Sequence, residues 1–183
     1  LAFGQRVEGP KAWSLCLDNQ QAAYEATRYL IDRGHTRIVH ISSHRGGMDV
    51  RDRLLGYRKA MREAGLEARV VYGDLEEEGG YRAAAEAFRR YPDTTAIFAA
   101  NDQTAFGAML ELHRRGISVP QDVSVVGFDD LPVWRGRLPE RGSGHYAALV
   151  HFYDGHYRDQ PVRMAVLLAP VAGATVTVGS AVI

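Results

Sequence analysis

The chain has a single cysteine, Cys16, among its 183 residues. One cysteine excludes an internal disulfide and is compatible with a reducing compartment, where a buried cysteine acts as a small hydrophobic residue. No apolar run approaches the roughly 20 residues that cross a membrane. Lysine plus arginine equal aspartate plus glutamate at 22 each, so the chain lacks the basic surface that holds a nucleic-acid backbone. If a larger protein containing this chain binds DNA, the contacting surface lies elsewhere.

Sequence signatures of metal and nucleotide chemistry are also missing. The seven histidines show no ligand spacing supported by cysteines or paired carboxylates. Gly46 and Gly47 lack the lysine and serine or threonine of a phosphate-binding loop, and no Gly-x-Ser-x-Gly nucleophile motif occurs. We therefore expect no cofactor, no metal and no enzymatic activity.

Helix-period segments alternate with short apolar segments between about residue 20 and residue 130. Gly34, Gly65 and Gly116 follow three of the helical segments, at the position where a left-handed residue ends a helix. This alternation is typical of repeated βα units around a parallel sheet. The expected helices cover about 19–33, 50–64, 79–90 and 102–115, and the expected strands cover 37–41, 69–72, 95–99 and 123–126.

Two of these helices have a clear apolar stripe. The third carries Tyr81, Ala84, Ala85 and Phe88 at the spacing of a core-facing stripe. The fourth is expected to bury Ala105, Ala108, Met109 and Leu112.

Polar side chains follow each expected strand. In open α/β sheets, ligands bind beyond the carboxyl ends of the parallel strands, so these residues are candidates for a site. An arginine donates through a rigid fork, a carboxylate accepts from two hydroxyls, and an asparagine amide does both, which suits the vicinal hydroxyls of a sugar. In chain order, the candidates are Ser42, Ser43, Asp49, Arg53, Asp74, Asn101, Asp102, Asp129 and Asp130.

Each candidate also has an ordinary structural interpretation. An Asn101 or Asp102 at a strand-to-helix junction is more often a helix N-cap. Arg53 and its neighbours can form a solvated charged face of the second helix. Asp129 and Asp130 can form a turn. The coincidence of all these groups at one edge of the sheet favours a ligand site over the separate interpretations.

Five short motifs together carry a family resemblance. The chain resembles the effector-binding domain of the lactose-repressor/galactose-repressor family of bacterial transcription regulators, over residues 1 to about 134. The motifs are Leu17-Asp18-Asn19, Arg33-Gly34-His35-Thr36-Arg37-Ile38, Arg51-Asp52-Arg53-Leu54-Leu55-Gly56-Tyr57, the Ala100-Asn101-Asp102-Gln103 stretch that leads to Gly107-Ala108-Met109, and Val125-Val126-Gly127-Phe128-Asp129-Asp130.

The resemblance implies an α/β fold, a three-layer αβα sandwich of the periplasmic-binding-protein-like type I. In that fold two lobes close like a clamshell on a sugar or related effector, and this chain holds most of the C-terminal lobe. Residues 1–19 would be the end of the N-terminal lobe and the crossover, and residues 20–134 the C-terminal lobe. Residues 135–183 depart from the family pattern, which indicates either a divergent tail or an altered reading frame.

The resemblance also implies a site and partners. Arg53, Asn101 and Asp129 match the family's effector contacts, and Asp49 and Leu75 stand at secondary contact positions. The expected protein is a cytoplasmic homodimer that binds a small-molecule effector, and that binds operator DNA through a helix-turn-helix absent from this chain. The expected protein is thus a regulator, most simply a repressor, whose effector changes its affinity for DNA.

Two other classes of protein share some of these features. A periplasmic sugar-binding protein of a transport system has the same architecture, although the Arg33–Ile38 junction favours the regulator. A small α/β enzyme using Asp102, Asp129 or Asp130 as a base lacks a partnered nucleophile or cofactor loop here, but fold alone does not separate these classes.

Overall fold

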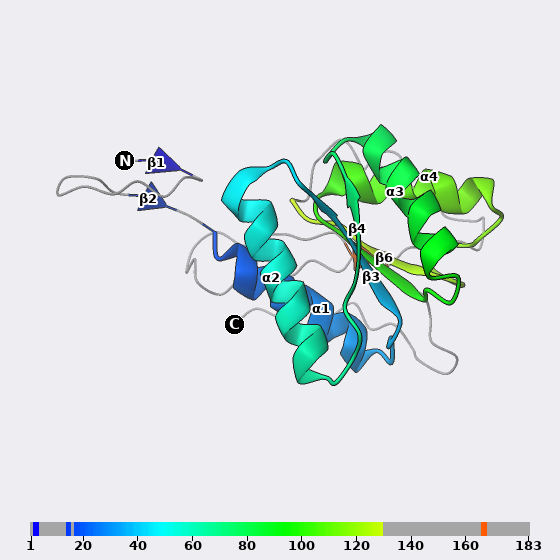
Figure 1. Ribbon diagram of the computed structural model, residues 1–183, viewed down its shortest axis with the longest axis horizontal. Helices are drawn as coiled ribbons and strands as arrows, with labels where there is room; N and C mark the ends of the chain where they lie inside the picture. Colours follow the sequence, from blue (N-terminus) through cyan, green and yellow to red (C-terminus); the bar gives the residue numbers. More distant parts are fainter. Residues whose placement is uncertain (1, 4–13, 16, 130–165, 168–183) are drawn as a thin grey trace.

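The computed structural model describes residues 2–3, 14–15, 17–129 and 166–167 (Figure 1). All four helices and all four strands expected between residues 20 and 130 are present, each within three residues of its expected bounds. The helices are α1 (Asn19–Asp32), α2 (Gly47–Glu63), α3 (Glu77–Arg90) and α4 (Asp102–Arg114), and the strands are β1 (Ala2–Phe3), β2 (Ser14–Leu15), β3 (Ile38–Ser43), β4 (Arg69–Gly73), β5 (Ala96–Ala99), β6 (Ser124–Val126) and β7 (Val166–Leu167).

The main sheet has the strand order β4-β3-β5-β6-β7. Strands β4, β3, β5 and β6 are parallel, and β7 pairs antiparallel with β6. Helices α1 and α2 cover one face of the sheet, and α3 and α4 cover the other (Figure 1). Strands β1 and β2 form a separate parallel pair. The three-layer αβα fold class expected from the sequence is therefore confirmed.

Alternate residues of the strands supply the two layers of the core. Ile38 and Phe98 face α1 and α2 and pack with Tyr57, whereas Val39 and Ile97 face α3 and α4. All five are fully buried. Because successive strand side chains point to opposite faces, short apolar strands serve both helical layers at once.

The stripe expected on α3 is only partly correct. Ala84 is buried, but Tyr81 and Phe88 are half-buried, and the fully buried face also contains small residues outside the expected stripe. A Cβ atom at Gly80 would overlap the backbone of Thr104, so α3 and α4 approach closely at this point. The close approach selects glycine and alanine for the centre of the contact and leaves the large side chains at its margin. On α4, the expected Ala105, Ala108 and Leu112 are buried and Met109 is half-buried.

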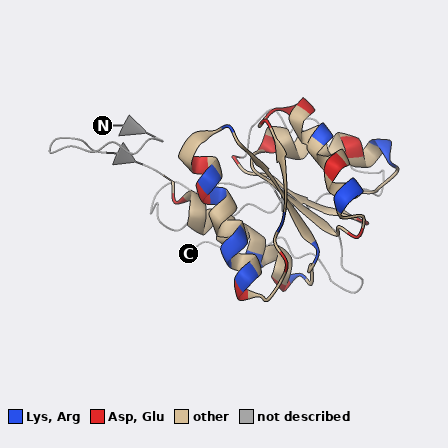
Figure 2. Ribbon diagram, viewed as in Figure 1, with Lys and Arg blue, Asp and Glu red and all other residues tan. Residues whose placement is uncertain are grey.

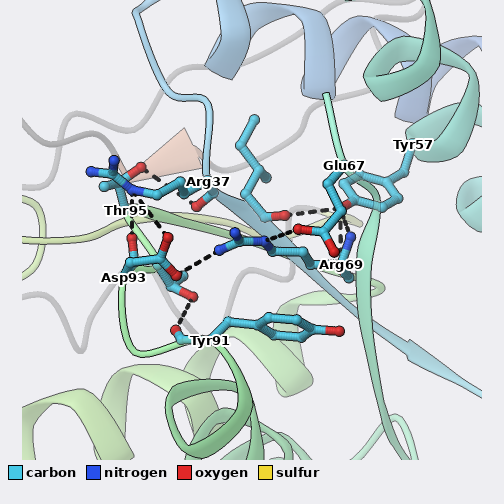
Figure 3. A network of polar contacts seen from close by, with 9 residues as sticks. Arg37, Tyr57, Glu67, Arg69, Tyr91, Asp93 and Thr95 are labelled. Carbon is cyan, nitrogen blue, oxygen red and sulfur yellow. Dashed lines mark hydrogen bonds and ion pairs between the residues drawn. The ribbon is translucent and has the colours of Figure 1, made fainter. Parts of the chain in front are cut away.

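A polar network ties together the amino ends of the strands (Figure 3). Asp93 accepts from Arg69 Nη1 at 2.7 Å, and its backbone carbonyl accepts from Arg37 Nε at 2.8 Å. The Tyr57 hydroxyl donates to the carbonyl of Ile38 and accepts from the backbone N–H of Arg69, both at 2.8 Å. These contacts hold α2 and the sheet together at the pole opposite the carboxyl ends of the strands.

The buried Glu111 on α4 predicts an acid-sensitive contribution to stability. Its side chain is 0% exposed and accepts from Arg114 Nε at 2.7 Å and Arg115 Nε at 2.6 Å. The hydrogen bond from Arg114 is the largest cause that lowers the pKa of Glu111 from 4.5 to about 2. A carboxyl whose pKa is lower in the folded state stabilises the fold above its unfolded-state pKa, and the stabilisation is lost as the pH falls toward the folded value.

We therefore expect Glu111→Gln to flatten the fall in the free energy of unfolding between pH 4.5 and 2, as measured by urea denaturation. Glu86→Gln is the matched control, because Glu86 also pairs with an arginine three residues on but is solvent-accessible. Parallel pH profiles for Glu111→Gln and the unsubstituted protein would contradict this account.

Candidate functional site

The winding direction of the chain reverses between the neighbouring strands β3 and β5. The chain leaves β3 into α2 on one face of the sheet and leaves β5 into α4 on the other face. Such a reversal of winding direction between neighbouring parallel strands opens a crevice in which α/β proteins bind ligands. The residues that follow β3, β5 and β6 all lie at the carboxyl edge of the sheet.

Arg53 is a buried, positively charged residue at this edge of the sheet. It comes from α2, is only 8% exposed, and directs its guanidinium at three oxygen atoms. Its Nε donates to Asn19 Oδ1 at 2.8 Å, Nη1 donates to the carbonyl of Ala100 at 2.6 Å, and Nη2 lies 3.4 Å from Asp129 Oδ1. Its Cζ atom stacks 3.7 Å above the centre of the Phe128 ring. The alternative of a solvated face is wrong for Arg53.

The charges of this cluster shift one another's pKa values. Burial lowers the pKa of Arg53, and the carboxylates of Asp129, Asp49 and Asp102 oppose that shift. Burial raises the pKa of Asp129, the Arg53 guanidinium opposes the change, and Asp49 reinforces it. An arginine remains protonated throughout the physiological range, and Nη2 of Arg53 lies within ion-pair distance of Asp129 Oδ1, at 3.4 Å.

Asn101 is the N-cap of α4, as the ordinary interpretation of its position predicted. Its Oδ1 accepts from the backbone N–H of Thr104 at 2.9 Å, and its Nδ2 donates to the carbonyl of Leu75 at 2.9 Å. Asp102 is the first residue of the helix and is buried. Asn101 thus links the loop after β4 to the start of α4. Its contact with an effector stays a prediction.

Two of the residues predicted to contact an effector have an unusual backbone. Leu75 has φ of 75° and Asp129 has φ of 108°, and they are the non-glycine residues with positive φ in the part of the chain that the structure describes. Such conformations are costly for residues with a Cβ atom and cluster at functional sites. Both belong to the five residues for which the sequence predicted effector contact.

The remaining candidates divide between this edge and its surroundings. Asp49 lies in the first turn of α2 and is half-buried, and Ser42 is buried at the end of β3. Asp74 pairs with Arg82 at 3.1 Å instead. Asp130 lies outside the described residues. Asp74 and Arg82 border a hollow of about 280 Å³ at the edge strand, and the other residues that line it are Tyr72, Gly73, Gly79, Ala83 and Glu86.

Sequence reasoning missed two residues that hold Arg53 in this cluster. Asn19 holds Arg53 Nε, and Phe128 forms the floor beneath the guanidinium. Both occur in motifs that carry the family resemblance, but their roles depend on contacts between distant segments. One local signal pointed to Asn19, a polar residue at the first position of a helix that Asp18 already caps.

The described residues offer no alternative metal site. Within them, no three histidine, cysteine, aspartate or glutamate side chains are grouped to hold an ion. His40 is buried in the core between Tyr57 and Phe98, and burial lowers its pKa to about 4, so it is neutral at physiological pH.

Among the helices that the structure describes, none is long and apolar enough to span a bilayer.

The two roles of Asn101 can be separated by substitution. We expect Asn101→Ala to lower the free energy of unfolding by about 1–2 kcal/mol, because α4 loses its cap and the Leu75 carbonyl loses its donor. Asn101→Asp keeps an acceptor for Thr104 and is expected to retain most of that stability. Chemical denaturation followed by circular dichroism measures both. Equal losses for the two substitutions would show that the Leu75 contact, not the cap, dominates.

Comparison with known proteins identifies the class of domain. A family model described as a periplasmic binding protein-like domain matches residues 27–141, which is more than half of the chain. A second model, described as a two-component sensor kinase N-terminal domain, matches residues 115–183 and covers less than half. Most of that second match lies outside the described residues.

Individual relatives identify the family. The HTH-type transcriptional regulator GalR of Escherichia coli (strain K12) is 42% identical over 135 residues, which are 72% of this chain and 39% of that protein. A sugar-binding regulator of the LacI family from Escherichia coli, solved in complex with phosphate, superposes with a TM-score of 0.69 at 29% identity and covers 75% of this chain and 50% of its own. The complex of the regulator CelR with cellobiose has a TM-score of 0.65 at 37% identity, over 72% of this chain and 42% of that one.

The chain therefore belongs to the lactose-repressor/galactose-repressor family of transcription regulators and contains part of the family's effector-binding domain. It spans less than half the length of the curated relatives that it matches.

Proposed function

We propose that this chain is the effector-sensing lobe of a transcriptional repressor that binds a sugar through Arg53, Asn101 and Asp129, with Asp49 and Leu75 as secondary contacts. Binding closes this lobe on its counterpart, and the changed lobe orientation in a homodimer alters the affinity of a helix-turn-helix for operator DNA. The repressor would act in the cytoplasm. Its domains would divide at residues 1–19, 20–134 and 135–183, as the sequence suggested.

The pairing of Arg53 with Asp129 is the observation that carries this proposal. Three of the five N–H donors of a guanidinium are directed at Asn19, Ala100 and Asp129, which leaves two for a ligand among the contacts of the described residues. Asp129 is an acceptor beside them, and 37% of its side chain is exposed. Donors next to an acceptor match adjacent hydroxyls, each of which donates one hydrogen bond and accepts others.

The names of the relatives support a sugar as the effector. Solved relatives include a sugar-binding regulator and a regulator in complex with cellobiose. Repressors named PurR, at 33% to 38% identity, are also similar to this chain, so the test includes purine bases beside sugars.

Isothermal titration calorimetry of the full-length protein against hexoses, disaccharides and purine bases tests the proposal. We expect one class of hydroxylated ligand to bind and to change operator affinity in a gel-shift assay. Failure of every ligand to bind a folded, operator-binding protein would count against it. A periplasmic sugar-binding protein would bind sugar without any operator affinity, and turnover of a bound sugar would favour an enzyme.

A further inference from the structure

One exposed face of α2 combines arginines with large apolar side chains. Its residues lie within about 80° of one another around the helix, because each residue turns the helix by about 100°. Two of them, Met48 and Leu55, are 59% and 39% exposed. We call this face the arginine stripe, and its residues are Met48, Arg51, Leu55, Arg58 and Arg62.

The arginines of the other described helices have acidic partners three or four residues away. The pairs are Arg28–Asp32, Arg82–Glu78, Arg89–Glu86, Arg90–Glu86, Arg114–Glu111 and Arg115–Glu111.

The arginine stripe has no such compensation. No acidic residue stands three or four positions from Arg51, Arg58 or Arg62 in the sequence, and none of the three forms an ion pair within the described residues. Arg58 and Arg62 are instead four residues apart, a spacing at which like charges destabilise a helix. Figure 2 marks basic residues recurring along α2. The stripe is therefore a solvent-facing row of uncompensated positive charge.

Carboxylates of a protein are the anions that this stripe fits. A guanidinium donates two parallel hydrogen bonds to one carboxylate. Arginine and methionine are enriched in protein interfaces, whereas lysine, which is depleted there, is absent from the stripe. From Met48 to Arg62 the stripe extends about 21 Å, which is the length of about four turns of a partner helix.

A nucleic acid or a membrane fits the stripe less well. A phosphate backbone offers no apolar partner for Met48 and Leu55. A helix that lies on a membrane inserts its whole apolar face, but the apolar face of α2, with Tyr57 and Met61, is buried in the core. Arginines interleaved with apolar side chains instead match a helix that carries acidic and apolar residues at the same spacing.

We propose that the arginine stripe of α2 binds an acidic, amphipathic helix of another protein. Arg51, Arg58 and Arg62 pair with its carboxylates, and Met48 and Leu55 pack against its apolar side chains. One helix face offers less than the roughly 800 Å² that each partner contributes to a standard interface, so we expect a weak complex that depends on charge. The stripe lies on the side of α2 opposite Arg53, so the inference does not rest on the proposed effector site.

A charge-inverted copy of the stripe tests the proposal. The probe is a labelled helical peptide of alanine and glutamine that repeats the spacing of the stripe, with glutamate in place of each arginine and leucine at the two apolar positions. Fluorescence anisotropy measures its binding to the full-length protein. We expect saturable binding that weakens at least about tenfold between about 50 and 300 mM sodium chloride, because salt screens exposed charges. The same peptide with lysine in place of glutamate is expected not to bind.

The triple substitution Arg51→Gln, Arg58→Gln and Arg62→Gln removes the exposed charges without breaking an ion pair. We expect it to weaken binding of the glutamate peptide at least about tenfold and to leave the circular dichroism spectrum unchanged, because each lost contact between arginine and carboxylate is charge-assisted.

The matched control removes three arginines that already have acidic partners on α1 and α3. It is the triple substitution Arg28→Gln, Arg82→Gln and Arg89→Gln. We expect this control to bind the glutamate peptide within about twofold of the unsubstituted protein, because exposed ion pairs contribute little to stability and lie on other helices.

A glutamate peptide that does not bind would overturn the proposal, and so would equal losses of affinity in the two triple variants. Duplex DNA without an operator and phosphatidylserine vesicles are the competing anions. If substitution of Arg51, Arg58 and Arg62 weakens binding to either of these and not to the peptide, the stripe recognises phosphate and the proposal is wrong.

Discussion

Replacement of Arg53 by alanine is expected to weaken effector binding at least about 100-fold, because each charged hydrogen bond contributes about 1.5–3 kcal/mol and Arg53 offers two N–H groups to the ligand. The substitution also leaves Asn19 Oδ1 and the carbonyl of Ala100 without a buried donor. We expect that change to lower the free energy of unfolding by about 2–3 kcal/mol and the domain to remain folded. Calorimetry and urea denaturation measure the two effects separately.

Tyr57→Phe is the matched control for Arg53→Ala. Tyr57 lies on the same helix, is fully buried, and bonds backbone groups through its hydroxyl at the opposite pole of the sheet (Figure 3). We expect a comparable loss of stability with effector affinity unchanged. If Arg53→Ala binds its effector within threefold of the unsubstituted protein, Arg53 is structural. If Tyr57→Phe loses affinity to the same extent, the loss reports destabilisation only.

Gly107→Val is expected to disrupt the packing of α3 on α4. A Cβ atom at Gly107 would overlap the carbonyl oxygen of Glu77 and crowd the backbone nitrogen of Tyr81. Backbone atoms of a packed helix cannot move aside as a flexible side chain can, so we expect a loss of about 3 kcal/mol or more, with much of the population unfolded at 37 °C. Thermal unfolding followed by circular dichroism measures the change.

Gly116→Ala distinguishes steric overlap from backbone strain. Gly116 has φ of 71°, but a Cβ atom there would meet nothing within 4 Å. The cost of a left-handed alanine alone is about 1 kcal/mol. If Gly107→Val lowered the free energy of unfolding no more than Gly116→Ala does, the close packing of α3 on α4 would be contradicted.

The charged surface illustrates what local pattern does and does not predict. Figure 2 marks lysine and arginine positions along the ribbon of α2, and a solvated face was one interpretation of Arg51, Asp52 and Arg53. Arg51 is exposed and agrees with that interpretation, whereas Arg53 is buried. Two residues along a helix separate the two arginines by about 200°, so one faces solvent and the other faces α1 and the end of the sheet.

The start of α2 shows a similar limit. The helix begins at Gly47, three residues before the expected start, after Gly46 in a left-handed conformation and without a side-chain cap. Helix starts are recognised in sequence mainly through capping side chains. α1 and α4 have such caps, Asp18 and Asn101, and their first residues agree with the prediction.

The sequence alone determined the order of helices and strands, the parallel sheet, and the edge at which Arg53, Asn101 and Asp129 gather. These depend on apolar periodicity, on glycine at helix ends, and on the rule that parallel strands share a carboxyl edge. Only the tertiary structure decided that Asn19 and Phe128 hold Arg53 in place. It also decided that glycines lie at the point where α3 and α4 pack most closely. Those features depend on contacts between segments that are far apart in the chain. The distance between two packed backbones decides these contacts, and the local sequence pattern does not predict that distance.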